Sequence, residues 1–272
     1  MLASLPEVGI VSQFAAIPTR VRVKEEPFRA GQNVDAFCLR RQELVQGRVF
    51  ERTAREFYRA FAGPDRLAFL YGFPGTRHLR LGRRRLGYAT PRPVCYWLRR
   101  VHRVASWRPW SRVEQGFDEA AADELWQRAA ARYATGVIRD ARWVERRYAS
   151  HPSTQYSYFT AWRRGEPRAR GVVRVEEEIV RWTELVWDGE ELSDLRALDR
   201  AVLALAIRSG ARQVSTWMDD ETPEAKLLTQ QGWERKAHPE SLHFTTVSLT
   251  ASLESDDLCR QFGVAMGDSD LV

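Results

Sequence analysis

The sequence contains few of the residues and motifs that mark disulfide-bonded, metal-binding and nucleotide-binding proteins. Only 3 of its 272 residues are cysteines, and no two of them form a C-x-x-C pair, so neither a disulfide framework nor a zinc site is indicated. The five histidines are scattered, and because no two have the H-x-x-x-H spacing of many metal sites we expect no metal: they are His78, His102, His151, His238 and His243. Neither a Walker-type phosphate loop nor a G-x-G-x-x-G motif occurs, which argues against a kinase or a dinucleotide-binding enzyme.

Long apolar runs are also lacking. No uninterrupted apolar segment reaches the length of about 18 residues that a membrane span needs, and the N-terminus has no charged region followed by an apolar run. We therefore expect no membrane span, no export signal and a cytoplasmic location. The remaining composition, 44% hydrophobic and 29% charged, is ordinary for a globular protein and sufficient for one large or two medium domains.

Lysine is scarce although the chain is basic. The formal net charge is +6 and the pI is near 9.5, but only 3 of the 42 basic residues are lysines. Such an excess of arginine is more typical of a coding bias than of a nucleic-acid surface, and no nucleic-acid-binding motif occurs. The densest arginine cluster lies between Arg77 and Arg85. We expect it to attract polyanions, but we do not expect nucleic acid to be the partner.

The stretch from Asn33 to Tyr88 has the pattern of a strand, a helix, a second strand and a second helix. Residues 34–39 alternate between apolar and mixed positions, as a half-buried strand does. Residues 50–61 carry apolar side chains every three or four positions, which places them on one buried stripe of a helix. Residues 67–71 form a short apolar run, and an arginine-rich helix follows. A βαβα unit of this kind indicates an α/β fold with a mixed sheet.

The turn before the first helix of this unit suits a diphosphate. The segment Val45-Gln46-Gly47-Arg48-Val49 exposes free backbone N–H groups at the positive end of the helix dipole, and nearby arginines add charge. The alternative is that Gly47 only permits a turn and that the arginines are solvated.

Several blocks of the sequence, taken together, resemble a known family. DAFCL…QGRVFERTAREF and LAFLYGFPGTRHLRLGRRRLGY resemble the acyl-CoA-binding core of the GNAT N-acyltransferase superfamily, in particular its two-domain (tandem) branch. The resemblance implies an α+β fold with a mixed sheet and acetyl-CoA, or another acyl-CoA, as co-substrate. It also implies a pyrophosphate turn and a place where two splayed strands admit the pantetheine arm. The first would be formed by Gln46, Gly47, Arg48, Val49 and Phe50, and the second would lie beside Phe73, Pro74 and Gly75.

Acyl transfer from a thioester to an amine needs a base for the incoming ammonium, donors for the oxyanion and an acid for the departing thiolate. Asp35 lies on the strand nearest the expected thioester and is the candidate base, and Tyr88 follows the second helix and is the candidate acid. The backbone N–H groups of Phe37, Cys38 and Leu39 would polarise the thioester carbonyl. Structural alternatives remain: Asp35 could tie down neighbouring backbone, Tyr88 could be a core ring, and Cys38 could be a small apolar filler.

The second half of the sequence repeats the plan of the first. Gly87 and Gly232 each follow the last predicted helix of their unit, and they lie 145 residues apart. The helix and the strand that precede that last helix also start 145 residues apart in the two halves. An internal duplication is the simplest account. We expect an N-terminal GNAT-like domain over residues 1–105, with the acyl-CoA site, and a degenerate GNAT-like domain over residues 106–272. In the second domain the acidic run 188–194 would repel a diphosphate.

The two ends of the first domain carry further expectations. Residues 9–16 and 21–34 are predicted to form a hairpin, and only residues 1–8 precede it, so the domain would lack the first strand and helices of a GNAT domain. The open sheet edge would then be covered by the C-terminal half or by a second subunit in a homodimer. At the other end we expect a closing strand over residues 93–98 and a connector whose tryptophans, Trp107 and Trp110 among them, pack between domains.

The function expected from these residues is N-acyl transfer from acyl-CoA to an amine by direct attack. The acceptor would be a small-molecule or peptide amine. The alternative is a non-catalytic GNAT-fold protein that senses a ligand or mediates an interaction, which the short N-terminus and the single-glycine turn favour. Relatives of this fold that use aminoacyl-tRNA are a further alternative, which the diphosphate-like turn opposes.

Overall fold

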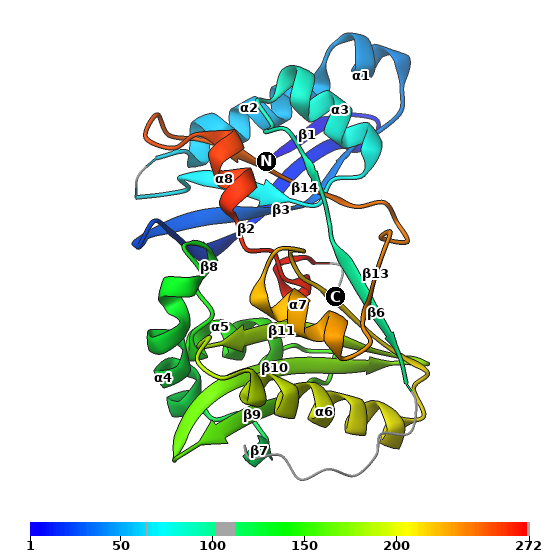
Figure 1. The fold of residues 1–272 in the computed structure, drawn as a ribbon. Coiled ribbons are helices and arrows are strands. Elements are labelled where there is room, and N and C mark those ends of the chain that lie inside the picture. The colour runs from blue at the N-terminus through cyan, green and yellow to red at the C-terminus, as the bar shows by residue number, and fades with distance from the viewer. Residues whose placement is uncertain (64, 102–111, 271–272) are drawn as a thin grey trace. The chain divides into compact units, whose positions relative to one another are not determined.

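The computed structural model describes residues 1–63, 65–101 and 112–270. Their contacts divide the chain into two compact units, each with its own seven-stranded mixed sheet (Figure 1). Unit 1 takes the described residues of Met1–Pro93, Thr135–Val137 and Pro239–Phe262, and unit 2 those of Val94–Ala134, Ile138–His238 and Gly263–Val272. The predicted α/β class with mixed sheets is confirmed. Four of the sequence features named above lie outside the described residues: His102, Trp107, Trp110 and the domain boundary at residues 105 and 106.

Unit 1 has the sheet order β1-β2-β3-β4-β14-β5, and β8 also pairs with β2. Strands β3 and β4 run parallel, whereas the other pairs are antiparallel. Its strands are β1 (Leu2–Leu5), β2 (Gly9–Val23), β3 (Glu26–Cys38), β4 (Phe69–Gly72), β5 (Arg92–Pro93), β8 (Thr135–Val137) and β14 (His243–Ser248). Its helices are α1 (Gln42–Gln46), α2 (Val49–Phe61), α3 (Thr76–Arg85) and α8 (Ser255–Gln261).

The predicted hairpin is present as β2 and β3. Lys24 and Glu25 form its tip, and both have a positive φ (48° and 76°), as a two-residue type I′ turn requires. Two short strands cover the outer edge of β2. One is β1, which we did not predict, and the other is β8, which comes from the second half of the sequence. Residues 1–8 therefore supply a strand that the sequence analysis did not expect, while a homodimer at this edge stays a prediction.

Helices α2 and α3 pack on one face of the unit 1 sheet (Figure 1). Successive residues of a strand point to opposite faces, so Leu70 of β4 packs with this helical layer while Phe69 and Tyr71 face the other side. There they contact Phe262, which directly follows α8. The buried helical layer combines residues of β2, α2, β4, α3 and β14 in one apolar cluster: Phe14, Ala54, Phe57, Leu67, Leu70, Leu79, Leu86, Tyr88 and Val247.

Unit 2 has the sheet order β13-β6-β12-β11-β10-β9-β7. Its strands are β6 (Tyr96–Arg100), β7 (Arg112–Gln115), β9 (Ser157–Arg163), β10 (Glu166–Glu176), β11 (Ile179–Trp187), β12 (Gln213–Trp217) and β13 (Glu234–Lys236). Its helices are α4 (Glu119–Ala129), α5 (Ala141–Val144), α6 (Leu192–Ser209) and α7 (Pro223–Gln230), with 3₁₀ turns at Ala130–Arg132 and Met266–Asp268 and a π turn at Glu145–Ala149. Thr222 caps α7 as predicted, because its side chain accepts a hydrogen bond from the N–H of Ala225 (3.2 Å).

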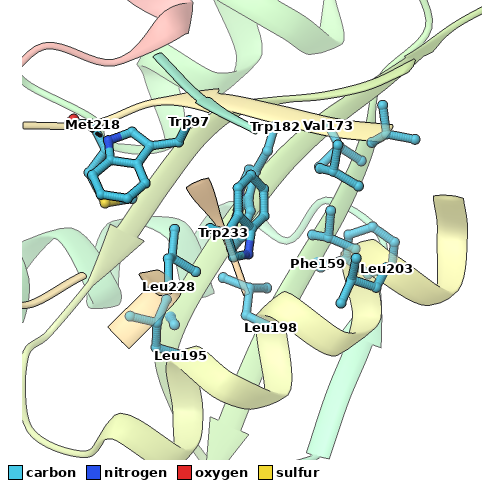
Figure 2. Packing of buried hydrophobic residues seen from close by; sticks show 14 of the residues in the cluster. Trp97, Phe159, Val173, Trp182, Leu195, Leu198, Leu203, Met218, Leu228 and Trp233 are labelled. Carbon is cyan, nitrogen blue, oxygen red and sulfur yellow. Dashed lines mark hydrogen bonds between the residues drawn. The ribbon is translucent and has the colours of Figure 1, made fainter. Parts of the chain in front are cut away.

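Tryptophan rings fill the core of unit 2. Trp182 lies in the middle of the cluster drawn in Figure 2, and its ring centroid is 6.0 Å from that of Trp233. Leu195, Leu198 and Leu203 of α6 belong to the same cluster (Figure 2). Two indole N–H groups find partners: Trp97 donates to the Met218 carbonyl (2.9 Å) and Trp233 to Asp199 (2.9 Å). These two tryptophans combine a large apolar area with a satisfied donor, whereas the indole N–H of Trp182 has no hydrogen-bond partner among the described residues.

The first half of the sequence places one strand in the unit 2 sheet, and the second half places two strands, β8 and β14, in the unit 1 sheet. Strand β6 belongs to the first half but lies between β12 and β13 in unit 2, and β14 belongs to the second half but lies between β4 and β5 in unit 1. The single closing strand predicted over residues 93–98 is therefore wrong, because β5 and β6 enter different sheets. The two compact units therefore do not coincide with the two halves of the sequence. The boundary between the halves at residues 105 and 106 stays a prediction.

Candidate functional site

Unit 1 contains a cavity of about 740 Å³ at the start of α2. It lies among the end of β3, α1, the first turn of α2 and one side of α3, from Thr76 to Arg85. Seven residues that the sequence analysis proposed for the acyl-CoA site line it: Phe37, Cys38, Leu39, Arg48, Val49, Phe50 and Gly75. The other lining residues are Ala36, Arg40, Leu44, Val45, Glu51, Thr76, Arg77, His78, Leu81 and Arg85. A cavity of this size falls in the usual range for ligand sites.

The start of α2 has free backbone donors. No side chain caps this helix, and the first N–H groups of a helix have no partner within it. The helix is preceded by α1, a short helix that we did not predict. Gly47 has an ordinary right-handed conformation (φ −74°), whereas Arg48 is left-handed (φ 52°). Arg48, and not Gly47, therefore has the left-handed backbone conformation at this turn. Neither Gln46 nor Gly47 lines the cavity.

Arginine side chains give the cavity a positive charge. Arg40, Arg48, Arg77 and Arg85 line it together with one carboxylate, that of Glu51. Glu51 is mostly buried and forms ion pairs with Arg48 (3.7 Å) and with Arg55 (3.2 Å), which lies one turn further along α2. Four positive charges and one negative charge leave an excess of three positive charges beside the free N–H groups. This combination attracts an anion with more than one charge.

The pairing of β3 with β4 ends before β3 reaches the cavity. Their pairing stops at Gln32 and Tyr71, and beyond this point Asn33 lies beside Gly72, where an added Cβ would be 3.3 Å from that of Asn33. The register between β2 and β3 then shifts at Asp35, which has a φ of 48°. Such a bulge bends a strand. The bend coincides with the point from which β3 lines the cavity.

The backbone donors expected on β3 are only partly available. The N–H of Leu39 donates to the carbonyl of Val11 (2.9 Å), so it cannot polarise a thioester as we expected. Successive residues of a strand point their N–H groups to opposite sides. Because the N–H of Leu39 points toward β2, the N–H of Cys38 points away from β2. The Cys38 thiol has a weak contact with the Leu39 carbonyl (3.6 Å).

Asp35 does not belong to the cavity. Its side chain is exposed, and its backbone carbonyl accepts a hydrogen bond from the Gln13 side chain (3.1 Å). The structural alternative, a residue at a turn of the backbone, fits this position better than the role of base. Phe73 and Pro74 also lie outside the cavity lining, although Gly75 belongs to it.

Tyr88 belongs to a buried polar cluster next to the cavity. Its hydroxyl accepts a hydrogen bond from Asn33 Nδ2 (3.1 Å) and lies 2.9 Å from His78 Nε2. Burial raises the pKa of Tyr88 well above its usual range, although the hydrogen bond from Asn33 lowers it. Burial also lowers the pKa of His78 to about 4. Both groups are therefore neutral near pH 7, and Tyr88 keeps its proton.

His78 is the residue that sequence reasoning missed. It lines the cavity, and its spacing carried a signal, because His78 and Gly82 lie one helical turn apart on the same face of α3. An added Cβ at Gly82 would lie 2.2 to 2.7 Å from atoms of the Tyr88 ring, so this glycine makes room for the ring. A histidine one turn before a glycine, with a tyrosine shortly after the helix, is the pattern that could have been recognised.

The corresponding helix start in unit 2 is filled by its own side chains. Arg168 pairs with Asp188 (3.0 Å) and Glu190 (2.7 Å), and Arg163 pairs with the fully buried Asp194 (3.1 Å). An added Cβ at Gly189 would lie 2.1 Å from the Arg132 guanidinium. The acidic run therefore neutralises arginines of unit 2 and leaves no free cations for a diphosphate among these residues.

Within residues 1–63, 65–101 and 112–270, no group of three or more histidine, cysteine or acidic side chains could hold a metal ion. Over the same ranges, no helix has both the length and the apolar character needed to cross a bilayer.

Comparison with known proteins gives structural matches only. No family model and no curated protein sequence matches the chain. A conserved Enterococcus faecalis V583 protein, described as a probable N-acyltransferase, matches with a TM-score of 0.65 and 12% identity over 90% of this chain and 60% of its own. A GCN5-related N-acetyltransferase from Anabaena variabilis ATCC 29413 matches with a TM-score of 0.66 and 13% identity over 90% and 61%.

A third match is Saccharomyces cerevisiae N-myristoyltransferase with bound myristoyl-CoA. Its TM-score is 0.54 and its identity 12%, over 94% of this chain and 74% of the yeast chain. The present chain thus spans only about three fifths of the length of the two bacterial proteins. At these identities the likeness concerns structure and not sequence. The chain has the fold of the GNAT N-acetyltransferases.

Proposed function

We propose that the unit 1 cavity binds acyl-CoA and that the protein transfers the acyl group to an amine by direct attack. The observation that carries the proposal is the position of the cavity, which joins the uncapped start of α2 to the end of β3, beyond the pairing of β3 with β4. In this proposal the N–H groups of Val49 and Phe50, with Arg48, hold the pyrophosphate. The pantetheine arm then runs toward the end of β3.

The chemistry follows from the residues at the far end of this path. The acceptor nitrogen attacks the thioester carbonyl, and the N–H of Cys38 stabilises the oxyanion. The C–S bond breaks with its electron pair going to sulfur, and the thiolate takes the proton of Tyr88, which lies behind His78 at the cavity wall and stays protonated because burial raises its pKa. The acceptor nitrogen then gives up one proton, which restores the phenol. Because Asp35 lies outside the cavity, positioning of a neutral amine supplies much of the rate in place of a carboxylate base. The acceptor is a small-molecule or peptide amine in the cytoplasm, and the acyl group is acetyl or another acyl group.

A calorimetric titration with acetyl-CoA, and in parallel with desulfo-CoA, tests the proposal. Moderate salt screens unspecific charge attraction. We expect saturable binding of one ligand per chain that Arg48→Glu weakens strongly, followed by consumption of the thioester when a panel of amines is added. If a chain shown to be folded gives no heat of binding with either ligand, the proposal that it binds acyl-CoA is wrong.

A non-catalytic acyl-CoA-binding protein is the second candidate. Two observations favour it: Asp35 lies outside the cavity, and the Leu39 N–H is engaged with Val11. The two candidates differ in one measurement, because both bind acyl-CoA but only the enzyme releases a free thiol in the presence of an amine.

A further inference from the structure

The outer face of α3 carries positive charge that the cavity does not use. This helix contains five arginines and no acidic residue. Arg77 and Arg85 line the cavity, whereas Arg80, Arg83 and Arg84 lie outside its lining. All five arginines are exposed, and none forms an ion pair with any residue that the structure describes. A ligand confined to the cavity would therefore leave three exposed cations on α3 unpaired.

Three large apolar side chains are exposed around the mouth of the same cavity. Phe37 comes from the end of β3, Val45 from α1 and Leu81 from α3, and they are 41%, 63% and 37% exposed. All three line the cavity, so it opens to solvent between them. We call these three side chains the apolar rim. Exposed apolar side chains that are grouped and surrounded by polar residues are typical of an interaction site.

Leu81 connects the apolar rim to the arginines of α3. Arg80 and Leu81 lie three and four residues after Arg77, so the three side chains are neighbours on the helix surface. Arg84 follows one turn later on the same stripe. Apolar side chains next to arginines have the composition of a protein–protein interface, and the unpaired arginines require an acidic partner.

Other polyanions fit this surface less well. A nucleic acid would pair its phosphates with the arginines, but its backbone would leave the aliphatic side chains of Val45 and Leu81 uncovered. An anionic lipid surface would contact both kinds of side chain, but it would close the mouth through which the pantetheine arm of the proposed function enters. An acidic protein that inserts an arm into the cavity contacts the arginines, the apolar rim and the cavity together.

We propose that the acyl donor is an acidic carrier protein that bears the acyl group on a phosphopantetheine arm. Helix α3 and the apolar rim bind the protein, and the arm enters the cavity. Its phosphodiester then takes the place at the start of α2 that we assign to the pyrophosphate. This inference rests on the proposed function, because it changes only the group that presents the thioester. The same arm joined to an adenine nucleotide is CoA, so one cavity can accept both donors.

The reaction is unchanged by the carrier, and it balances. The acceptor nitrogen forms a C–N bond to the acyl carbon and gives up one proton. The C–S bond breaks with its electron pair going to sulfur, and sulfur gains one proton. The free thiol stays on the arm of the carrier protein, and neither an oxidant nor a reductant is needed.

Binding of a purified bacterial acyl carrier protein to the full chain tests the inference without an acceptor. Calorimetry at moderate salt compares three probes: the carrier loaded with an acetyl group, the same carrier without its arm, and acetyl-CoA. We expect the loaded carrier to bind roughly tenfold more tightly than the carrier without its arm, since only the loaded carrier also fills the cavity. Equal affinities would show that the arm stays outside the cavity and would overturn the inference.

Two double variants distinguish the surface from the cavity. Arg80→Glu with Arg84→Glu should weaken binding of the loaded carrier by roughly tenfold or more, and should change the affinity for acetyl-CoA less than about threefold, because neither residue lines the cavity. Val45→Gln with Leu81→Gln removes apolar area without a change in charge and should weaken binding of the carrier about fivefold. Unchanged carrier affinity in both double variants would overturn the inference.

The matched control is an equal change in charge elsewhere on the protein. Arg164 and Arg208 are exposed arginines of unit 2, and Arg164→Glu with Arg208→Glu changes the net charge as much as the reversal on α3 does. We expect the control to change carrier affinity less than about twofold at moderate salt. A loss as large as that from positions 80 and 84 would show that only the net charge matters, and the proposed docking surface would be wrong.

The possible failures are distinguishable. If acetyl-CoA binds and the loaded carrier does not, the carrier inference is wrong while the proposed function stands. If neither binds to a chain shown to be folded by circular dichroism, both are wrong. Vesicles of phosphatidylcholine with phosphatidylglycerol, and a short RNA, are tested in parallel. Binding of either one that is lost in the α3 double variant, without binding of the carrier, would assign the surface to that polyanion and overturn the inference.

Discussion

The starts of α2 and α6 occupy equivalent places in the two halves of the chain, but they use their charges in opposite ways. At α2 the arginines Arg40, Arg77 and Arg85 line a cavity with one carboxylate among them. At α6 the carboxylates outnumber the arginines and are paired with them, and Asp194 is completely buried. Among these residues, the α2 start therefore leaves positive charge available to an anion, whereas the α6 start does not. The local side chains, and not the helix start by itself, set this difference.

Removal of Arg168 should have the largest effect on stability. Arg168→Met leaves the Asp188 carboxylate buried without its partner, so the free energy of unfolding should fall by about 3–5 kcal/mol. Urea denaturation measures the loss. Acyl-CoA binding by the remaining folded protein should not change, because Arg168 belongs to unit 2. Arg212→Met, which removes an exposed ion pair with Glu178, is the control and should cost less than about 1 kcal/mol.

Charge reversal at Arg48 should have the largest effect on binding. Arg48→Glu places a second carboxylate beside Glu51 at the helix start, so we expect acyl-CoA affinity to fall about 100-fold, or about 2.7 kcal/mol. Arg48→Gln should lose about tenfold. Arg52→Glu, a reversal on the same helix that does not line the cavity, should change affinity less than about threefold at moderate salt. Equal losses at positions 48 and 52 would mean that only the general charge of the surface matters.

Acid should destabilise the protein partly through His78. Its pKa in the folded protein, about 4, lies below the ordinary value of 6.5, so the unfolded chain binds a proton that the folded chain does not bind. Stability from this group is therefore present above pH 6.5 and is lost as pH falls toward 4, by roughly 2–3 kcal/mol. Denaturation between pH 7 and 4.5 should show a smaller slope for His78→Gln. Glu184 contributes in a different window, because Arg170 and Arg139 lower its pKa despite burial, and its stabilisation is lost at more acidic pH.

The smallest predicted effect distinguishes the contribution of the Arg48 backbone conformation to stability from the contribution of its charge to binding. Its left-handed φ of 52° costs a non-glycine residue about 1 kcal/mol. Arg48→Gly should therefore be more stable than Arg48→Ala by about 1 kcal/mol in thermal or urea denaturation, while both lose acyl-CoA affinity to the same extent. Equal stabilities would show that the turn relaxes and that the conformation is not imposed by the surrounding structure.

Local patterns predicted α2 and α7 well but missed α1 and β1. The apolar repeat from Phe50 to Phe61 gave α2, and Thr222 with Pro223 marked the start of α7, because these signals depend only on neighbouring residues. They could not predict the exchange of β6 and β14. Which strand a short apolar segment joins depends on partners more than a hundred residues away, and the pattern of β6 fits either sheet.

The candidate site was predicted in the same uneven way. Arg48, Val49 and Phe50 were found because a helix start with a nearby cation is visible in the sequence. Asp35 was misplaced, since a bulge with a positive φ turns it out of the strand pattern. His78 was overlooked, because a single histidine acquires meaning only when folding brings Tyr88 and Asn33 to it.

The exchange of strands also sets the order in which the protein can be completed during synthesis. Strand β14 lies between β4 and β5, and it is made after every residue that lines the cavity. While the ribosome is still translating the second half, the sheet beneath the cavity has a gap, with the edges of β4 and β5 unpaired. A nascent chain released before residue 243 would lack β14 altogether. Completion of the unit 1 sheet therefore waits until residues 243–248 have been translated.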